Sequence, residues 1–504
     1  MKFESIIGLE IHVQLKTKSK MFCGCDNSGE NLPPNTVICP ICLGHPGTLP
    51  VINNQALRFG VLAGLALNCQ IPDSSKFDRK NYFYPDLPKG YQISQYDEPV
   101  AINGFLNIEI PAKKNERTSA RIGITRLHLE EDAAKLLHSA DKKTSLVDYN
   151  RAGTPLAEIV TEPDMRSPLE AKSFLQELRL MMRYLAVSDA DMEKGHLRCD
   201  ANISLRPLGE TKLYPKTEIK NINSFRAVER ALEYEIMRQT KLWEEGAPQE
   251  ATTTRGWDDS RQITVLQRTK EEAHDYRYFP EPDLPPLELS EMSSRLSREL
   301  PELPAQKRER FKNEYFFSSE DARTVSEDLE LSNYAEKVIS ELKEWLSTLP
   351  EIEGSGEEVW QKEGKKLAKL VSGWLLSKLG GLLGADGTEI KDIKITPENF
   401  AEFITMIYAN KISSSAAQTV LEEMLKTGAE PEEIIEDKGL GQVSGDEELI
   451  PVVERVLAHH PEQVAEYKAG KIQVIQFLKG VVMKETHGTA NPQVAEKLLK
   501  DRLA

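Results

Sequence analysis

The chain has 504 residues, of which 39% are hydrophobic and 29% charged, and its formal net charge at pH 7 is −16. These proportions are typical of a folded protein of two to four domains, and no apolar run approaches the ~20 residues of a membrane span. Because the net charge is negative, the chain is not basic throughout, and a nucleic-acid partner would have to bind to a local basic patch. The first residues match neither a signal peptide nor a transit peptide, so we expect a cytoplasmic location and no membrane partner.

Apolar and polar residues alternate over residues 6–15, which predicts a strand with one buried face. The other face carries Glu10 and His12, two residues apart and on the same side. Carboxylate oxygen and neutral imidazole nitrogen are both metal ligands, so this pair could bind a divalent cation. Taken alone, the stretch is explained better by a surface glutamate and histidine on a half-exposed strand.

Four cysteines follow in two close pairs, Cys23 with Cys25 and Cys39 with Cys42. Two short knuckles joined by a loop can place four thiolates at the corners of a tetrahedron, which is the geometry of a structural zinc site. The alternatives are two disulfides, disfavoured because there is no secretory signal, or four free core thiols. A four-cysteine site has no open coordination position, so we expect this zinc to be structural and not catalytic.

Residues 76–92 interleave four basic residues with five aromatic ones. The chain has no Walker A motif, so this stretch is the candidate for binding the phosphates and the base of a nucleotide. The alternative is a proline-containing loop packed on its own aromatic side chains. A similar stretch at residues 276–286 suggests a partly duplicated structural element. The candidate nucleotide-binding residues are Lys76, Arg79, Lys80, Tyr82 and Lys89.

Two later stretches repeat the acidic pattern of the first strand. Residues 126–132 place His128, Glu130 and Asp132 on one face, and residues 155–164 place Glu158 on one side of an extended run. Acidic side chains on aliphatic strands are costly to bury unless a cation or a basic partner offsets them. Three such strands favour a shared Mg²⁺ site, which points to phosphoryl transfer because Mg²⁺ retains substrate phosphates. The predicted ligands and catalytic residues are Glu10, His12, Glu130 (preferred over Glu131 on the alternation) and Glu158.

The order of elements predicts an α+β fold. Further strands are expected over residues 106–110, 120–129, 157–161, 201–205 and 262–267, and helices over 53–67, 167–185 and 227–245. After residue 290 the chain is predicted to be helical over 304–314, 319–326, 331–346, 365–383, 398–410, 413–427, 448–459, 461–469, 474–486 and 492–503. Residues 351–358 and 384–388 are expected to be loops. The last stretch, 466–504, carries seven basic and four acidic residues, a net charge of +3. This charge fits an anionic partner or a solvated helical face equally well.

Taken together, these motifs resemble the B subunit of the aspartyl/glutamyl-tRNA(Asn/Gln) amidotransferases, and the match extends over essentially the whole chain. The resemblance rests on the paired cysteines and on residues 8–14, 79–95, 127–135, 148–164, 195–205, 220–225 and 275–282. The chain departs from the family pattern in a long acidic stretch at residues 351–390 and in Thr489, where a basic residue is expected. These departures bear on the contacts of the tail and leave the site untouched.

The resemblance implies an N-terminal cradle domain (residues 1–292) that has a mainly antiparallel sheet and carries the active site. A helical domain (293–396) and a helical tail domain that contacts tRNA (397–504) would follow. It also implies a heterotrimer with an amidase-type A subunit, which makes ammonia from glutamine, and a small C subunit. The implied substrates are ATP and mischarged Glu-tRNA(Gln), Asp-tRNA(Asn) or both. The side-chain carboxylate would be phosphorylated and then amidated, with Mg²⁺ in the site and zinc as a structural ion.

Two other functions are compatible with the residues. The first is a non-catalytic, zinc-containing RNA-binding protein, and the second is an ATP-dependent amide ligase that acts on a free metabolite. ATP consumption that depends on aminoacyl-tRNA would separate the amidotransferase from both.

Overall fold

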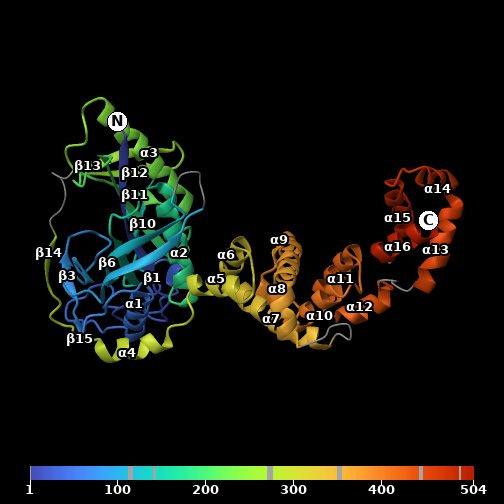
Figure 1. Cartoon of the computed structure of the whole chain (residues 1–504). Coiled ribbons are helices and arrows are strands. Elements are labelled where there is room, and N and C mark those ends of the chain that lie inside the picture. Colours follow the sequence, from blue (N-terminus) through green and yellow to red (C-terminus); the bar gives the residue numbers. More distant parts are fainter. Residues whose placement is uncertain are drawn as a thin grey trace. The chain divides into compact units, whose positions relative to one another are not determined.

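The structure, a computed structural model, describes residues 2–111, 117–139, 143–269, 276–348, 355–441, 446–486 and 490–503. It divides into two units, Met1–Pro304 and Ala305–Ala504, which we describe separately (Figure 1). Part of the predicted acidic loop (351–354) and the tail segment 487–489, with Thr489, lie outside the described residues. Among the helices that are described, none is both long and apolar enough to cross a lipid bilayer.

The first unit is built on an eight-stranded sheet with the strand order β13-β12-β11-β10-β1-β9-β6-β5. Neighbouring strands are antiparallel except for β11 and β12, which are parallel. This topology, together with the helices that follow, confirms the predicted α+β class with a mainly antiparallel sheet. The strands are β1 (Phe3–Gln14), β5 (Ala101–Glu109), β6 (Ser119–Glu131), β9 (Pro155–Thr161), β10 (Leu197–Pro207), β11 (Thr217–Ile222), β12 (Thr253–Asp258) and β13 (Ile263–Thr269).

Helices α1 (Asn54–Ala66), α2 (Pro168–Tyr184) and α3 (Phe225–Glu244) pack against one face of this sheet. Each begins at a side-chain cap, because Asn53, Ser167 and Ser224 accept hydrogen bonds from backbone amides of the first turn. Proline at the first position of α2 completes the start signal. All three helices therefore lie where the sequence predicts them, with α3 beginning two residues earlier because Ser224 is its cap.

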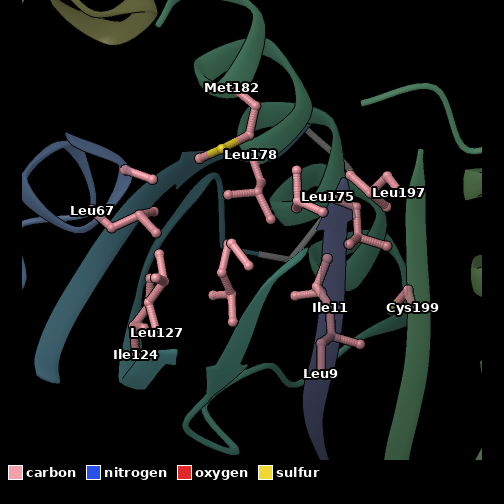
Figure 2. Close-up of a cluster of buried hydrophobic side chains, with 14 of the residues drawn as sticks. Leu9, Ile11, Leu67, Ile124, Leu127, Leu175, Leu178, Met182, Leu197 and Cys199 are labelled. Carbon is pink, nitrogen blue, oxygen red and sulfur yellow. The ribbon is translucent and has the colours of Figure 1, made fainter. Parts of the chain in front are cut away.

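The apolar face of β1 forms the centre of this core. Figure 2 shows Leu9 and Ile11 facing Leu175, Leu178 and Met182 of α2, and all five side chains are at most 1% exposed. Burying one such side chain contributes about 1.5–3 kcal/mol. Since the apolar face is thereby fixed against the helices, the Glu10 and His12 side chains are directed to the opposite face of the sheet.

A bulge in β6 changes which residues of this strand face the core. The register against β9 shifts between Ile124 and Arg126. Ile122 and Ile124 are buried in the core before the shift, and Leu127 and Leu129 are buried there after it. The predicted alternation is therefore correct for the last part of β6, which carries the candidate ligands, and is out of phase before the bulge.

The two similar stretches of the sequence are partners in one small sheet. Strand β3 (Asp78–Asn81) pairs with β14 (Arg277–Pro280) on one side and with β4 (Tyr91–Ser94) on the other. Residue Lys80 lies opposite Tyr278 across the first pair. The remaining elements of the unit are β2 (Ser74–Ser75) with β15 (Leu287–Glu288), β7 (Lys135–His138) with β8 (Ser145–Asp148), a 3-10 turn at Gly29–Asn31, and α4 (Ser290–Glu299), which the sequence does not predict and which packs on α1.

The second unit is helical throughout its described regular elements. They are α5 (Pro304–Asn313), α6 (Ser319–Ser326), α7 (Leu329–Thr348), α8 (Gly356–Ser372), a π-helical stretch (Gly373–Leu379), α9 (Gly380–Asp386), a 3-10 turn (Ile390–Asp392), α10 (Pro397–Tyr408), α11 (Ser414–Thr427), α12 (Pro431–Lys438), α13 (Asp446–His459), α14 (Pro461–Lys468), α15 (Val474–Glu485) and α16 (Pro492–Leu503).

Two expectations for this unit are wrong. Helix α8 begins at Gly356 and not at residue 365, because Ser355 and Glu358 form a capping box inside the predicted loop. The helix then continues to Asp386 through a region where glycines suggest a loop at 384–388. Helix α12 was not expected from the sequence.

The apolar side chains of the second unit form two clusters. One runs from Phe311 to Ile434 and the other from Leu449 to Leu503. The expected boundary between residues 396 and 397 falls within the first cluster, where α10 packs against α7. The division into residues 1–292, 293–396 and 397–504 therefore stays a prediction, and the apolar clusters separate after Ile434.

Candidate active site

Three strands place potential ligands in one row on the polar face of the sheet. His12 of β1 lies opposite Glu158 of β9, and Glu158 lies opposite His128 of β6. Glu158 Oε2 is 3.4 Å from His12 Nε2 and 3.2 Å from His128 Nε2. Glu130 bridges the same two histidines, with a carboxylate oxygen 3.6 Å from each Nε2 atom. The strand register therefore brings together residues that are far apart in the chain.

The side chains that could hold a cation form two overlapping groups. Glu10, His12 and Glu158 make one, and His128, Glu130 and Glu158 make the other; within each group the ligand atoms all lie within 4.8 Å of one another. All four predicted ligands thus lie in one cluster. His128 joins them, although the sequence analysis did not select it as a ligand. The signal was present, because His128 shares the polar face with Glu130 at a spacing of two.

The charges in this cluster compensate one another. Burial raises the pKa of Glu158, but the His128 and His12 side chains outweigh this effect and hold it well below its ordinary value. Burial lowers the pKa of His128, but the Glu158 and Glu130 carboxylates raise it to about 9. Burial and the neighbouring Glu158 raise the pKa of Glu10. The cluster is thus a set of carboxylate–imidazolium pairs that would lose protons when a cation binds, since metals ligate neutral imidazole.

The cluster opens into a polar cavity of about 450 Å³. On its wall, Asp132 accepts a hydrogen bond of 2.7 Å from Arg198 and lies 3.5 Å from Arg151. Lys220 pairs with Asp200 and Glu218, at a bulge in β11 where Asn221 has a φ of 63°. These cavity residues were not predicted, because the strand was expected only over residues 201–205, whereas β10 begins at Leu197 and places Arg198 and Asp200 on its polar face.

Two of the five predicted ATP-binding residues, Lys80 and Tyr82, line this cavity. The Lys80 ammonium lies 4.9 Å from the centroid of the Tyr276 ring and forms no salt bridge with any described residue. Burial lowers the pKa of Lys80, but the Glu130 carboxylate and other neighbours outweigh it, so the pKa is raised and the side chain stays charged. Lys80 is therefore a cation available to an anionic ligand.

The other three predicted ATP-binding residues are engaged elsewhere. Arg79 points away from Lys80 on β3 and makes a bidentate pair with Glu281, at 2.7 and 2.8 Å. Lys76 lies 3.0 Å from Asp97, and Lys89 pairs with the buried Glu131. None of the three lines the cavity. Their proposed contact with ATP stays a prediction without geometric support.

The two adjacent glutamates of β6 have different surroundings. Glu130 accepts a hydrogen bond of 3.1 Å from Ser94 Oγ and faces the histidines. Glu131 accepts hydrogen bonds from Lys89 and, at 3.0 Å, from the backbone amide of Ile93. This arrangement agrees with the choice of Glu130 as the ligand, because the Glu131 carboxylate is used to fix the β4 hairpin.

The four cysteines of the knuckles lie together, with their sulfur atoms within 4.8 Å of one another and none in a disulfide. The Cys39 amide donates to Cys42 Sγ at 3.1 Å, and the buried Lys20 ammonium is 4.0 Å from the same sulfur. A hydrogen bond from Cys23 and the Lys20 charge lower the pKa of Cys42 to about 5, despite its burial. Four close thiols of which one readily ionises form a donor set that fits a tetrahedral zinc ion.

Models of known protein families match most of this chain. The model of the "GatB/GatE catalytic domain" family matches residues 5–294, and that of the "GatB domain" matches residues 357–503. The chain is 48% identical to the aspartyl/glutamyl-tRNA(Asn/Gln) amidotransferase B subunit of Dehalococcoides mccartyi (strain CBDB1) over 508 positions, which cover 100% of this chain and 99% of that protein. The chain belongs to the amidotransferase B-subunit family.

Other members of the B-subunit family are similarly close. The B subunit of Thermoanaerobacter sp. (strain X514) is 48% identical, with 100% of both chains covered. That of Brevibacillus brevis is 45% identical, with 100% of this chain and 99% of the relative covered. The catalytic-domain match, residues 5–294, includes the residues of the cavity and of the cysteine cluster.

Proposed function

We propose that this chain belongs to a tRNA-dependent amidotransferase and uses ATP to activate the side-chain carboxylate of mischarged Glu-tRNA(Gln), Asp-tRNA(Asn) or both. One observation carries the proposal. His12 of the row with Glu158 and His128 lines, together with Glu10 and Glu130, a cavity that is also lined by Lys80, which has no salt-bridge partner among the described residues. A cation site beside an available positive charge suits a polyphosphate.

The cation is proposed to be Mg²⁺, held by Glu10, His12, Glu130 and Glu158, with His128 as a further candidate. These side chains offer the oxygen and nitrogen donors that divalent cations accept. When bound, Mg²⁺ neutralises phosphate charge during transfer. Lys80 would bind a phosphate oxygen, and Arg198 and Arg151, both oriented by Asp132, would keep the wall of the cavity positive.

The proposed reaction has two steps. A substrate carboxylate oxygen bonds to the γ-phosphorus of ATP while the bond from that phosphorus to the β-phosphate oxygen breaks, so an acyl phosphate and ADP form. Ammonia then bonds to the acyl carbon, the carbon–oxygen bond to phosphate breaks, and the third proton of ammonia leaves with hydrogen phosphate. The activation is needed because a carboxylate is a poor acyl donor.

Ammonia is proposed to come from an amidase-type A subunit, in a heterotrimer with a small C subunit. The four cysteines are proposed to hold a structural zinc ion.

The helical tail is proposed to contact the tRNA backbone. In the tail, Lys479 and Lys500 pair with Glu496, whereas Lys468, Lys484 and Lys497 are exposed and form no salt bridge with described residues. A chain that ends at Gly441 keeps the first apolar cluster of the second unit intact and should bind tRNA more weakly, in a salt-dependent manner.

The test of the main proposal is amidation by the complex formed with the co-purified partner subunits. Mischarged Glu-tRNA(Gln) and Asp-tRNA(Asn) are each supplied with ATP, Mg²⁺ and glutamine, and ADP and amidated tRNA are measured. We expect ADP release only when charged tRNA is present. ATP consumption that is independent of tRNA, or none at all from an intact complex, would contradict the proposal.

A further inference from the structure

A fully buried lysine lies between the cysteine cluster and the cavity. Lys20 is 0% exposed and is among the largest side chains that the fold buries completely. Its ammonium donates to the carbonyl oxygens of Val37, at 2.9 Å, and of Tyr149, at 3.3 Å, and lies 4.0 Å from Cys42 Sγ. It forms no salt bridge with a carboxylate among the described residues. Because a buried ammonium is costly without a counter-charge, the position of Lys20 requires a negative group beside it.

The cysteine cluster supplies this negative charge. Cysteines that ligate zinc are thiolates, and four thiolates outnumber the charges on the metal, so a zinc-loaded cluster is anionic as a whole. Cys42 presents its sulfur to the Lys20 ammonium. The cluster is therefore the counter-ion of Lys20, and the burial of this lysine favours a zinc-loaded cluster on grounds independent of the spacing of the cysteines.

The second partner of Lys20 begins a tight turn that leads to the cavity. The Tyr149 carbonyl oxygen accepts a hydrogen bond of 3.1 Å from the backbone amide of Ala152, in addition to the one from Lys20. Arg151, which lies inside this turn, lines the cavity and is 3.5 Å from the Asp132 carboxylate. Lys20 therefore holds the carbonyl group that closes the turn on which Arg151 is placed.

The residue after the turn contacts both sides of this path. Gly153 has a φ of 86°, its amide donates to the Asp132 carbonyl oxygen at 2.9 Å, and its own carbonyl oxygen accepts from the Met21 amide at 2.7 Å. A Cβ atom built on Gly153 would lie 3.5 Å from Lys20 Cδ and 3.8 Å from Cys42 Cβ, which places both side chains next to this glycine. Consecutive contacts therefore join the cysteine cluster to the wall of the cavity.

We propose that Lys20 is a positioning residue for the reaction, which joins the anionic cysteine cluster to the turn that carries Arg151. The cluster attracts the ammonium on one side, and the ammonium holds the Tyr149 carbonyl oxygen on the other, so the zinc site fixes where Arg151 lies on the cavity wall. The cysteine cluster thus contributes to the geometry of the cavity as well as to the stability of the fold. The inference rests on the proposed function, which gives Arg151 its role beside the phosphates.

The first experiment is kinetic and uses the complex of the full chain with its co-purified partner subunits. Lys20→Met removes the ammonium but keeps an unbranched side chain, and it should raise KM for ATP by about tenfold, the value of one charge-assisted hydrogen bond, while kcat changes little. Lys20→Arg keeps the charge and should restore most of this loss. The matched control is Lys18→Met, which removes an exposed lysine of the same loop and should leave KM unchanged.

A double variant distinguishes a positioning role from a general loss of structure. Arg151→Met alone should raise KM for ATP about as much as Lys20→Met does. If Lys20 acts through Arg151, the variant that carries both substitutions should be no worse than Arg151→Met alone, because the effect of Arg151 can be lost only once. Losses that multiply to about a hundredfold would show that Lys20 does not act through Arg151, and the proposal would be wrong.

Hydrogen exchange tests the same contact without the reaction. In the Lys20→Met complex, the amides of Ala152 and Gly153 should exchange faster than in the wild-type complex, because the Tyr149 carbonyl oxygen is no longer held. The amides of α2, on the opposite face of the sheet, should exchange at the wild-type rate. Unchanged exchange at Ala152 and Gly153 would overturn the proposal.

The rate of zinc release to a colorimetric chelator tests the other side of the contact. The Lys20→Met complex keeps all four cysteines and should contain as much zinc as the wild type, but it should release the metal faster, because the anionic cluster has lost its neighbouring cation. Release at the wild-type rate would show that the cluster is not the counter-ion of Lys20, which contradicts the proposal.

These measurements also separate the inference from the proposed function. If exchange and zinc release change as expected in a complex that does not amidate tRNA, the link from the cluster through Lys20 to the turn stands and the proposed function fails. If wild-type amidation is normal and the Lys20→Met complex matches the wild type in KM, exchange and zinc release, the inference fails alone.

Discussion

The first unit contains two clusters of metal-ligand side chains, and they are assembled differently. The cysteine cluster comes from residues 23–42, within a single looped segment, and all four of its donors are thiols. The carboxylate–imidazole cluster combines strands β1, β6 and β9, so its ligands span residues 10 to 158, and it opens into a cavity of about 450 Å³. A closed set of donors stabilises a fold, whereas an open set leaves positions for substrate.

The difference extends to the surroundings of each cluster. In the open cluster each histidine contacts two carboxylates, so an added cation replaces protons. In the closed cluster the four sulfur atoms lie within 4.8 Å of one another, and those of Cys39 and Cys42 are 3.8 Å apart. Removal of the metal from the open cluster should therefore impair activity, whereas removal of the metal from the closed cluster should destabilise the fold.

The largest expected effect is on the open cluster. Glu158→Ala removes the carboxylate shared by both groups of ligands and should lower tRNA-dependent ADP release by about 10³-fold or more, because cation binding contributes several kcal/mol to such reactions. Glu10→Ala and His12→Ala should be similarly impaired, and a double variant should be scarcely worse than a single one, since all act on one cation. Glu162→Gln, an exposed neighbour outside the cluster, serves as the control. Near-normal release by the Glu10→Ala protein would remove β1 from the site.

The next effect concerns the closed cluster. Cys39→Ser should lower the zinc content and reduce the free energy of unfolding by about 3 kcal/mol, because a closed tetrahedral site loses a ligand. A strong chelator should reproduce this loss of stability, whereas exchange into Mg²⁺-free buffer should abolish activity reversibly without changing Tm. Metal analysis that finds no zinc in the wild-type protein would contradict the prediction.

The smallest effect distinguishes two lysines of the same segment. Lys80→Ala should raise KM for ATP about tenfold, the value of one charge-assisted hydrogen bond, and should leave Tm unchanged. Lys89→Ala should show the opposite pattern, because Glu131, which is only 3% exposed, would lose its charged partner. Equal KM values for ATP in the two variants would place the phosphates elsewhere.

The two clusters also differ in how far the sequence could predict them. The cysteine cluster follows from spacing alone, because its ligands are local. For the open cluster, alternation predicted which face each of Glu10, His12 and Glu130 occupies. The pairing of Glu158 with both His12 and His128 depends on strand register, which periodicity does not encode. The bulge near Thr125 could not be predicted either. It changes which side chains of β6 face the core, and no proline or glycine at that position marks it.

Long-range partners explain the residues that were misplaced. Arg79 belongs to a basic and aromatic stretch that resembles a phosphate site, but its partner is Glu281, about two hundred residues away in the chain. The helix that begins at Gly356 was missed because acidic residues and glycines outweighed the capping signal of Ser355 and Glu358. Local composition suggested a phosphate site in the first case and a loop in the second. An ion pair with a distant residue and a helix cap determined the observed structures.

The central position of β1 has a consequence for biosynthesis. Its two neighbours in the sheet are β9 and β10, which end at Thr161 and Pro207, although β1 itself ends at Gln14. At ~5–20 residues per second, the ribosome needs roughly 10–40 s to extend the chain from Gln14 to Pro207. Neither edge of this aliphatic strand is paired until β9 is complete, and one edge stays open until β10 is complete, which is the state in which nascent chains aggregate. We therefore expect the emerging chain to depend on a holdase chaperone until β10 is complete.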